Sequence, residues 1–232
     1  MTSKRNKKTS PAGHKTDQPA LTRSAMRRQR EREQRLQTIL EAAGTLFARE
    51  GYHQTGMERI ADEAEVSVGT VYFYFKNKED LLVKLLDQTG YELRNRLGTA
   101  FKNADGTLDG IRKAGKVFFE DFCPHHPEKI ALIFRESAGQ SDVVERHRKK
   151  IFDKLVDDLQ AALQSVAANR GSFRSPLAAE VMAASILGMF ERLAYQYLIW
   201  QDRQEVLDAV GRDAVDFIVG GIQNLLHRKH KA

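Results

Sequence analysis

Apolar residues recur at spacings of three and four along most of the chain, and this periodicity constrains the fold more than any other feature. Leu36, Ile39, Leu40, Ala43 and Phe47 form the first such stripe, which is typical of one face of an amphipathic helix. No stretch alternates between apolar and polar residues over the length of a strand. The sequence therefore predicts an all-α fold without a β-sheet.

Local signals indicate where these helices begin and end. Gly51 is expected to end the first helix as a C-terminal glycine, and Asn77 is expected to cap the fourth. Ser175–Pro176 indicates a cap followed by proline at the first helical position. The predicted helices span residues 25–50, 57–64, 68–74, 78–100, 107–123, 127–137, 141–168, 176–201 and 206–228.

The positive charge of the chain is concentrated at its N-terminus. Residues 1–35 contain 11 Lys or Arg and 3 Asp or Glu, a net charge of +8, so the other residues carry −2 of the total of +6. Residues 1–24 are too polar to form a core and are predicted to be a disordered basic arm. Such an arm favours a polyanionic partner with phosphates to neutralise, although a solvated tail without a partner is an open alternative.

Several classes of protein are disfavoured by what the sequence lacks. The longest apolar stretch, 181–190, is shorter than the roughly 20 residues of a membrane span, and the N-terminus has no apolar core of a secretory signal. The single Cys123 cannot form an internal disulfide, which is typical of a reducing compartment. We therefore expect a cytoplasmic, nucleoid-associated protein with no membrane partner.

The common catalytic and metal-binding motifs are also missing. The sequence has no phosphate-binding P-loop, no GxGxxG and no HExxH motif. Cys123–His126 is the one cluster that resembles metal ligands, but a zinc site usually needs four well-spaced donors. We therefore expect no enzyme activity, no cofactor and no metal.

The second and third predicted helices, 57–64 and 68–74, have the arrangement of a helix-turn-helix. Glu65, Val66 and Ser67 join them, and three residues suit the tight turn of this motif. Val66 is expected to pack between the helices, and Ser67 is expected to cap the second one. In such motifs the second helix lies in the major groove of DNA.

Four consecutive aromatic residues, 72–75, lie on the predicted recognition helix. Consecutive residues of a helix are about 100° apart, so all four cannot be buried on one side. Val71 and Phe75 are assigned to the core, and the exposed aromatic residues then need a partner. We prefer this interpretation to the alternative that they are ordinary core residues.

The other face of this helix suits contact with DNA. Gly69 permits close approach to the groove, and Thr70 can contact a base edge or a thymine methyl group. The side chains of Tyr72, Tyr74 and Lys78 can reach phosphates, which position a protein without reading the sequence.

Residues 36–86 resemble the DNA-binding domain of the TetR (tetracycline-repressor-type) family. The matching words are Ile39–Ala43, Leu46–Phe47, Gly51–Tyr52, Thr55, Ile60–Ala61, Val66–Phe75 and Lys78–Leu82. The resemblance implies a phosphate contact from Thr55 and backbone contacts from Tyr74 and Lys78. It places in or over the groove Ser67, Val68, Gly69, Thr70, Tyr72 and Phe73.

Three residues depart from the family pattern. Gly56 stands where a capping Ser or Thr is usual, so the second helix is expected to be weakly capped. Glu65 replaces the usual turn glycine and is expected to hold an unfavourable backbone angle. Glu58 stands where Arg is common, which disfavours a base contact from that helix.

The resemblance implies a helix-turn-helix domain at 25–86 and a helical effector-binding and dimerisation domain at 87–232. The predicted helix 176–201 is apolar on nearly all sides and must be buried all round. With the last helix it is expected to form a four-helix dimer interface, although both could instead complete a monomeric core. The expected interface residues are Leu187, Leu198, Phe217, Ile218, Gly221, Ile222 and Leu225. A homodimer would read a palindromic operator in double-stranded DNA.

Large apolar side chains in the second half suit an internal cavity, although most could be ordinary core. The candidate pocket residues are Phe118, Phe122, Phe134, Phe152, Met182, Met189, Phe190 and Tyr195. They indicate a small hydrophobic effector of acyl or aromatic chemistry. The expected function is a repressor that such an effector releases from DNA. The alternative is a non-enzymatic helical adaptor whose basic arm binds acidic partners.

Overall fold

The computed structural model describes residues 23–104 and 107–228 and confirms the predicted all-α class. Residues 1–36 and 37–232 form two compact units. Helix α1 (Arg23–Glu50) begins two residues before the predicted start and extends from the first unit into the second. The rest of the predicted arm, 1–22, lies outside the described residues.

The caps of the N-terminal helices confirm several local predictions. Gly51 ends α1 with a φ of 89°, and its N–H donates to the carbonyl of Phe47 at 3.0 Å. The Ser67 hydroxyl caps α3 (Val68–Tyr74), and the Asn77 side chain caps α4 (Lys78–Lys102) by accepting from the N–H of Asp80. These ends are decided by residues within four positions of them, which explains why sequence reasoning found them.

Two of the three departures from the family pattern, Gly56 and Glu65, have the predicted consequences for the backbone. Gly56 precedes α2 (Met57–Glu63) and makes no side-chain cap. Glu65 has a φ of 53° in the turn between α2 and α3. This is the left-handed region that a residue with a Cβ seldom adopts. The turn therefore holds backbone strain that a glycine would relieve.

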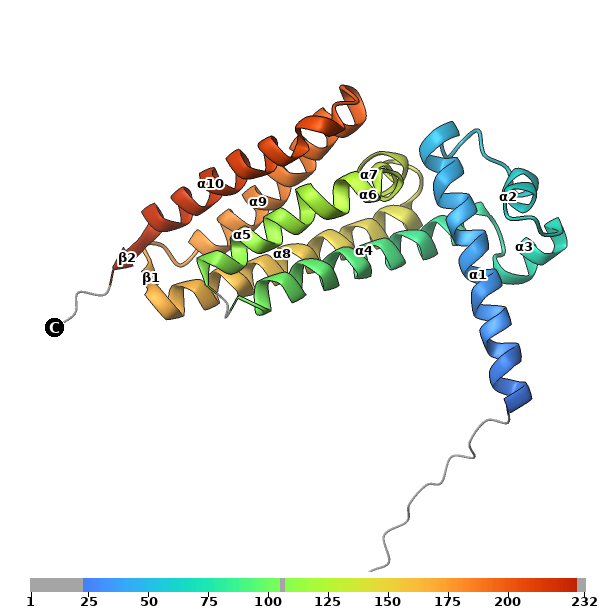
Figure 1. Ribbon diagram of the computed structural model, residues 1–232, viewed down its shortest axis with the longest axis horizontal. Coiled ribbons are helices and arrows are strands. Elements are labelled where there is room, and N and C mark those ends of the chain that lie inside the picture. The colour runs from blue at the N-terminus through green and yellow to red at the C-terminus, as the bar shows by residue number, and fades with distance from the viewer. Residues whose placement is uncertain (1–22, 105–106, 229–232) are drawn as a thin grey trace, which may run out of the picture. The chain divides into compact units, whose positions relative to one another are not determined.

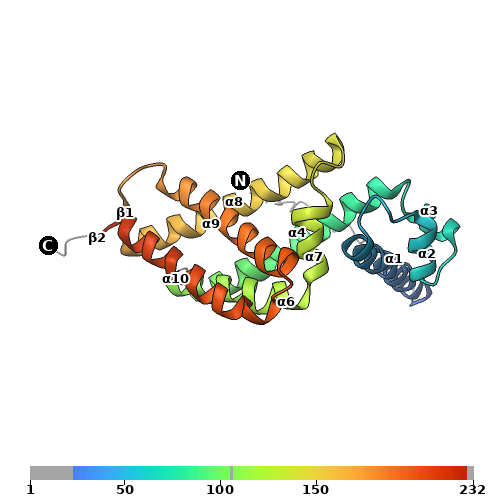
Figure 2. The ribbon, with the colours of Figure 1, turned by 90° about the horizontal axis from the view of Figure 1, so that it is seen from above.

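Figures 1 and 2 show long helices side by side in the part that follows: α4, α5 (Leu108–Lys116), α8 (Asp142–Arg170), α9 (Ala178–Ala194) and α10 (Leu207–Leu225). Shorter helices connect them: α6 (Cys123–His125), α7 (Pro127–Ala131) and the 3₁₀ turn η4 (Gln204–Val206). Three segments that were predicted as parts of regular helices are wider π-helical turns. They are η1 (Val117–Phe122), η2 (Leu132–Glu136) and η3 (Tyr195–Trp200).

The prediction of no β-sheet is wrong in one place. Strands β1 (Gly171–Phe173) and β2 (Leu226–Arg228) pair antiparallel, with Phe173 opposite Leu226. The last helix consequently ends at Leu225 rather than at residue 228. Three residues are too few to show an alternating pattern, so periodicity could not reveal this pair.

The predicted start of the 176–201 helix is also two residues early. Helix α9 begins at Ala178, and the hydroxyl of Ser175 accepts from the N–H of Leu177 at 3.2 Å before that start. Ser175 thus caps a turn that leads into the helix.

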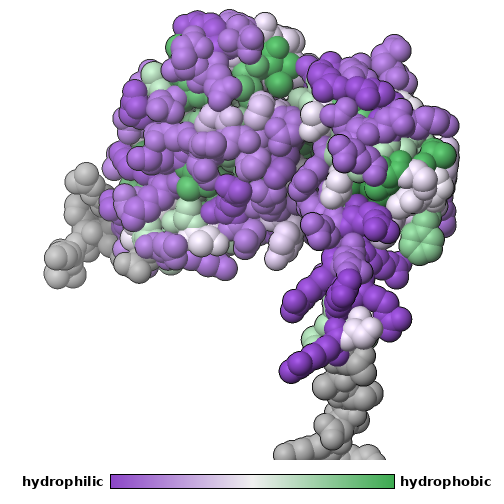
Figure 3. All heavy atoms as spheres, turned by 45° about the vertical axis from the view of Figure 1, so that its right-hand side comes forward, coloured by the Kyte–Doolittle hydropathy of each residue, from purple (hydrophilic) through white to green (hydrophobic). Residues whose placement is uncertain are grey.

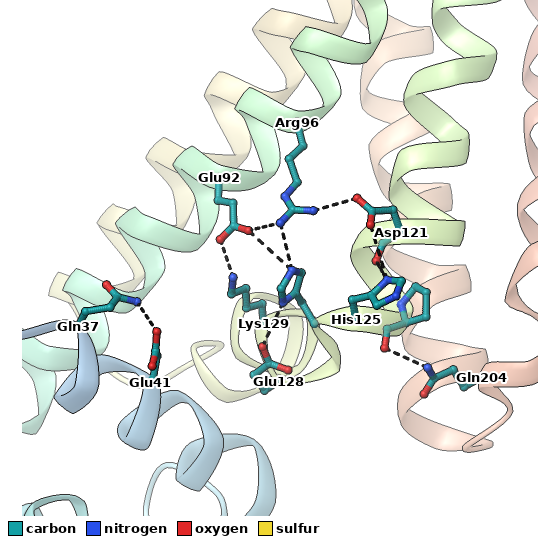
Figure 4. A network of polar contacts seen from close by, with 11 residues as sticks. Gln37, Glu41, Glu92, Arg96, Asp121, His125, Glu128, Lys129 and Gln204 are labelled. Carbon is teal, nitrogen blue, oxygen red and sulfur yellow. Dashed lines mark hydrogen bonds and ion pairs between the residues drawn. The ribbon is translucent and has the colours of Figure 1, made fainter. Parts of the chain in front are cut away.

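A polar network fixes α4 to the elements around α6 and α7 (Figure 4). Lys129 of α7 donates to the Glu92 carboxylate at 2.5 Å, and Arg96 lies 2.9 Å from the same group. Arg96 also pairs with Asp121 of η1 at 2.8 Å. Burial alone would raise the pKa of Glu92, but the bond from Lys129 and the nearby positive charges outweigh it and lower that pKa.

The aromatic core of the second half is built around three phenylalanines. The rings of Phe118 and Phe190 stack with centroids 4.8 Å apart, and Phe119 packs edge-on against both. These contacts join η1 to α9. No helix among the described residues is both long and apolar enough to cross a membrane.

Candidate nucleic-acid interface and internal cavity

Helix α3 presents the face that the sequence predicted. Val71 and Phe75 are buried, whereas Tyr72 is 50% exposed and Phe73 is 68% exposed. Val68 is exposed on the same short helix. In Figure 3, apolar side chains lie open among hydrophilic ones on this part of the molecule. A helix of seven residues with this much exposed aromatic surface is suited to a partner surface.

The hydroxyl of Ser67 fixes the start of α3. It accepts from the N–H of Thr70 at 3.2 Å and lies 2.8 Å from the hydroxyl of Thr70. Gly69 is exposed, and a Cβ there would meet only the Ser67 hydroxyl at 3.8 Å. The fold itself therefore has room for a side chain at position 69.

Two predicted phosphate contacts have other roles in the structure. Thr55 is fully buried, and its hydroxyl donates to the carbonyl of Gly51 at 2.9 Å. The Lys78 ammonium donates to the carbonyls of Tyr52, His53 and Thr55 at 2.7, 3.2 and 2.9 Å. Both side chains therefore hold the loop that follows α1, because its carbonyls would otherwise lack donors.

The Lys78 side chain is also shielded from water. Its ammonium lies 4.5 Å from the centre of the Tyr52 ring, and burial lowers the pKa of this lysine. Tyr74, the other predicted backbone contact, is half-buried, and its ring packs edge-on against Phe73 at 5.2 Å. Of the residues assigned to DNA, those of α3 are thus the most accessible.

A cavity of about 710 Å³ lies among α4, α5, α8, α9 and α10. Three of the eight predicted pocket residues line it: Phe118, Phe134 and Phe190. The other five, Phe122, Phe152, Met182, Met189 and Tyr195, are not among its lining residues. Sequence reasoning selected large apolar side chains but had no means of telling which face of each helix points to the empty space.

The remaining lining residues show what the cavity can bind. Apolar side chains dominate its surface, among them Leu97, Ile111, Leu155, Ile186 and Val215. One wall carries Arg94 of α4 and Asp158 of α8, which form two hydrogen bonds at 2.7 and 3.0 Å. That bond raises the pKa of Arg94 and keeps it charged. A long apolar molecule with one polar end fits this distribution.

The residues predicted for a dimer interface divide into two groups. Leu198, Ile218 and Ile222 are buried within the chain, Leu187 is half-buried, and Leu187 and Ile218 line the cavity. Phe217, Gly221 and Leu225 are exposed on α10. The predicted residues of α10 therefore divide between a core face, with Ile218 and Ile222, and an exposed face, with Phe217, Gly221 and Leu225.

Exposed apolar residues on α9 and α10 were missed by that prediction. Val181, Gly188 and Gly220 are exposed, as is Leu177 just before α9. A Cβ built on Gly188, Gly220 or Gly221 would meet nothing within 4 Å. This face of the two helices consequently has no packing partner among the described residues.

The Cys123–His126 cluster has no arrangement suited to a metal. Cys123 is fully buried, and burial raises the pKa of its thiol well above the usual range. His125 contacts the carbonyl of Asp121 at 2.7 Å, and His126 contacts Arg96 at 3.2 Å. Across 23–104 and 107–228, no three His, Cys, Asp or Glu side chains are placed to hold a metal ion.

A helix-turn-helix with an exposed recognition helix, followed by helices around a cavity, defines a DNA-binding transcriptional regulator. Residues 39–91 match the family described as "Bacterial regulatory proteins, tetR family". The N-terminal part of the chain thus resembles the DNA-binding domain of this family of transcriptional regulators. This match favours DNA over an acidic protein as the partner of the helix-turn-helix.

Relatives cover most of the chain. The chain is 24% identical to the fatty acid metabolism regulator protein of Bacillus subtilis over 186 residues. This alignment covers 80% of the chain and 94% of that protein. The solved structure of the fatty acid degradation regulator FadR from Bacillus halodurans has a TM-score of 0.72 at 20% identity, covering 80% and 98%. FadR from Bacillus subtilis, solved in complex with stearoyl-CoA, has a TM-score of 0.70 at 23% identity, covering 80% and 98%.

Proposed function

We propose that this regulator is a repressor that leaves its operator when a long-chain acyl thioester occupies the cavity. One observation carries the proposal: a single helix, α4, belongs to both sites. Leu81 and Leu82 in its first turns are fully buried beside the helix-turn-helix, and Leu93, Leu97 and Phe101 further along it line the cavity. A ligand that displaces α4 would therefore change the position of the recognition helix.

The choice of an acyl effector over an aromatic one rests on the cavity. Its volume lies within the range of about 300–1,000 Å³ that is typical of small-molecule sites. Apolar walls suit an alkyl chain, and the Arg94–Asp158 pair suits the polar end. The complex of FadR from Bacillus subtilis with stearoyl-CoA supports the same class of compound.

We assign the groove contacts to the residues of α3. Val68, Gly69, Thr70, Tyr72 and Phe73 would face base edges, and Tyr74 and the N–H groups at Ser67 would face phosphates. Thr55 and Lys78 would act indirectly, by holding the loop before α2. We infer a regulatory rather than a catalytic role, and a location in the cytoplasm beside the nucleoid.

We propose that the two domains have the boundaries predicted from the sequence. Residues 25–86 would be the DNA-binding domain, and residues 87–232 would bind the effector and form the dimer. The exposed face of α9 and α10 would meet the same face of a second copy, with close crossings where glycines lie. Its residues are Leu177, Val181, Gly188, Phe217, Gly220, Gly221 and Leu225.

The central experiment combines operator selection with effector titration. Genomic fragments retained by the full-length protein provide the operator, and fluorescence anisotropy then measures its dissociation constant with and without stearoyl-CoA. We expect weaker operator binding in stearoyl-CoA and no change in coenzyme A alone. Unchanged binding with stearoyl-CoA, stearic acid and benzoyl-CoA would reject a hydrophobic effector.

The dimer face has its own test. Val181→Asp would place a charge in the proposed interface, and Val143→Asp, at an exposed valine of α8, is the matched control. Sedimentation velocity should show monomers for the first variant and dimers for the second. If Val181→Asp remains a dimer at micromolar concentration, the interface lies elsewhere.

A further inference from the structure

Glu136 is a buried carboxylate that the proposed function does not use. It lies at the end of η2, it is 9% exposed, and one of its oxygens accepts from the backbone N–H of Tyr52 at 2.8 Å. Tyr52 follows the end of α1, 84 residues earlier in the chain. This bond therefore joins the part that surrounds the cavity to the part that carries the recognition helix.

Arg135, the neighbour of Glu136, makes a second connection at the same place. Its guanidinium donates to the other oxygen of Glu136 at 2.5 Å and to the carbonyl of Ala48 at 2.8 Å. Ala48 lies in the last turn of α1, where carbonyls lack partners within the helix. A cation there also interacts favourably with the helix dipole. Two adjacent side chains of η2 thus hold the last turn of α1 and Tyr52, two residues beyond its end.

The bond at Tyr52 continues toward α2 and α3. The N–H of Tyr52 is held by Glu136, and its carbonyl is held by Lys78 at the start of α4. Lys78 also holds the carbonyl of Thr55, which directly precedes the Gly56 cap of α2. A displacement of Glu136 would therefore move the loop that precedes the helix-turn-helix.

On its other side, η2 reaches the cavity. Phe134, two residues before Glu136, lines the cavity, and its ring lies 6.0 Å from that of Phe152. The N–H of Ser137 donates to the carbonyl of Leu132, five residues earlier, at 3.1 Å. Such π-helical turns are rare in proteins, and those that do occur often lie at functional sites. Within five residues, this turn touches both the cavity and the DNA-binding part.

We propose that Glu136, with Arg135, is a positioning residue that transmits the state of the cavity to the recognition helix. A filled cavity displaces Phe134, the turn that carries it shifts Glu136, and the loop at Tyr52 changes the angle of α2 and α3. This proposal rests on the proposed function in assigning the cavity to the effector. It adds a second connection to DNA besides α4.

The test measures coupling without requiring a natural effector. Ala162 of α8 lines the cavity, and Ala162→Phe fills part of it. Operator affinity is measured for the full-length parent, Ala162→Phe, Glu136→Ala and the double variant. We expect Ala162→Phe to weaken operator binding by a factor within the usual range for coupled sites, about 5–150-fold. In the Glu136→Ala background the same substitution should change affinity by less than about twofold.

Graded and control variants separate coupling from simple loss of stability. Glu136→Gln keeps an acceptor for Tyr52 and should give a response to cavity filling between those of the parent and Glu136→Ala. Glu120→Gln removes a carboxylate that pairs with Lys116, four residues earlier, and should keep the parental response. A purely structural Glu136 would change the melting temperature but leave the ratio of operator affinities as in the parent, and that result would overturn the proposal.

Two outcomes of the parental series are also decisive. If Ala162→Phe leaves operator affinity unchanged in the parent, the cavity sends no signal and the inference is rejected. Calorimetric titration of the same proteins with stearoyl-CoA tests the effector separately. A parent that responds to cavity filling but does not bind stearoyl-CoA would reject the proposed effector and leave the role of Glu136 supported.

Discussion

The recognition helix and the cavity are built in opposite ways. The start and the buried side of α3 are set by residues in or next to the helix: Ser67 caps it, and Val71 and Phe75 are its buried side chains. The cavity takes its walls from α4, α5, α8, α9 and α10 and from the turns η1 and η2, so that Phe118 and Phe190 meet across 72 positions. The first site can therefore be read from a short sequence word, whereas the second exists only after the helices have packed.

The largest expected effect would show whether the two sites are separable. Thr70→Ala combined with Tyr72→Ala removes two proposed contacts, each worth about 1–3 kcal/mol. Specific operator binding should weaken by at least about tenfold, while stearoyl-CoA binding stays parental because neither residue lines the cavity. Anisotropy with operator and scrambled duplexes measures the first, and calorimetry measures the second.

The scrambled duplex is the control, since contacts to phosphate do not depend on sequence. Parental operator affinity in the double variant would show that α3 does not read DNA. A matching loss of stearoyl-CoA binding would show that the two regions do not work separately.

In the DNA-binding part, the side chain of Lys78 is expected to contribute to stability. Lys78→Met leaves three carbonyls without their donor, and we expect the free energy of unfolding to fall by about 2 kcal/mol. Lys76→Met, two residues earlier and exposed, should change it little. Urea denaturation of both variants measures the difference. Equal stabilities would mean that the hydrogen bonds of Lys78 are replaced by water at little cost.

A substitution in the cavity should affect effector binding directly, in contrast to the double variant of α3. Ala114 of α5 lines the cavity, and Ala114→Asp would place a carboxylate among apolar walls. Binding of stearoyl-CoA should weaken about tenfold, since burying a charge without a partner is costly. Ala168→Asp, on the exposed face of α8, is the control. If calorimetry shows no difference between them, the acyl chain binds outside this cavity.

The smallest expected effect concerns pH and the network that holds α4 beside the cavity. The folded pKa of Glu92 is lowered, so its ionised form stabilises the fold fully above its unfolded pKa of about 4.3. That contribution is lost as the pH falls through the folded pKa. Glu92→Gln should therefore lose less stability than the parent between about pH 5 and pH 3.5.

The difference should be under about 1 kcal/mol, because these partly exposed pairs are weakened by water. Urea midpoints at several pH values give the comparison, and Glu41→Gln, at an exposed carboxylate of α1, is the control. A variant with the same slope as the parent would show that Glu92 does not contribute to acid sensitivity.

Much of the fold was predictable because its signals are local. Gly51, Ser67 and Asn77 act within their own turns. The unusual backbone angle of Glu65 was expected because this residue replaces the turn glycine of the family pattern. The β1–β2 pair was not predictable, because its strands are too short for a pattern and lie 53 residues apart.

The sites were predictable only where burial follows from one helix. The exposed face of α3 was identified because four consecutive aromatic residues cannot share one side. Lys78 and Thr55 were given phosphate contacts because a sequence does not show that nearby carbonyls need donors. Glu136 was not singled out, since its partner Tyr52 is 84 residues away and offers only a backbone N–H.

The solitary thiol of this chain has a practical consequence. Cys123 is the one cysteine in the sequence, and its sulfur is buried and held in the unreactive protonated form. A cysteine introduced on an exposed position of α3 would consequently react with a maleimide dye while the native one stays silent. In a dimer this attaches one fluorophore to each recognition helix without altering the parent background, so energy transfer between them would report their separation as compounds are added.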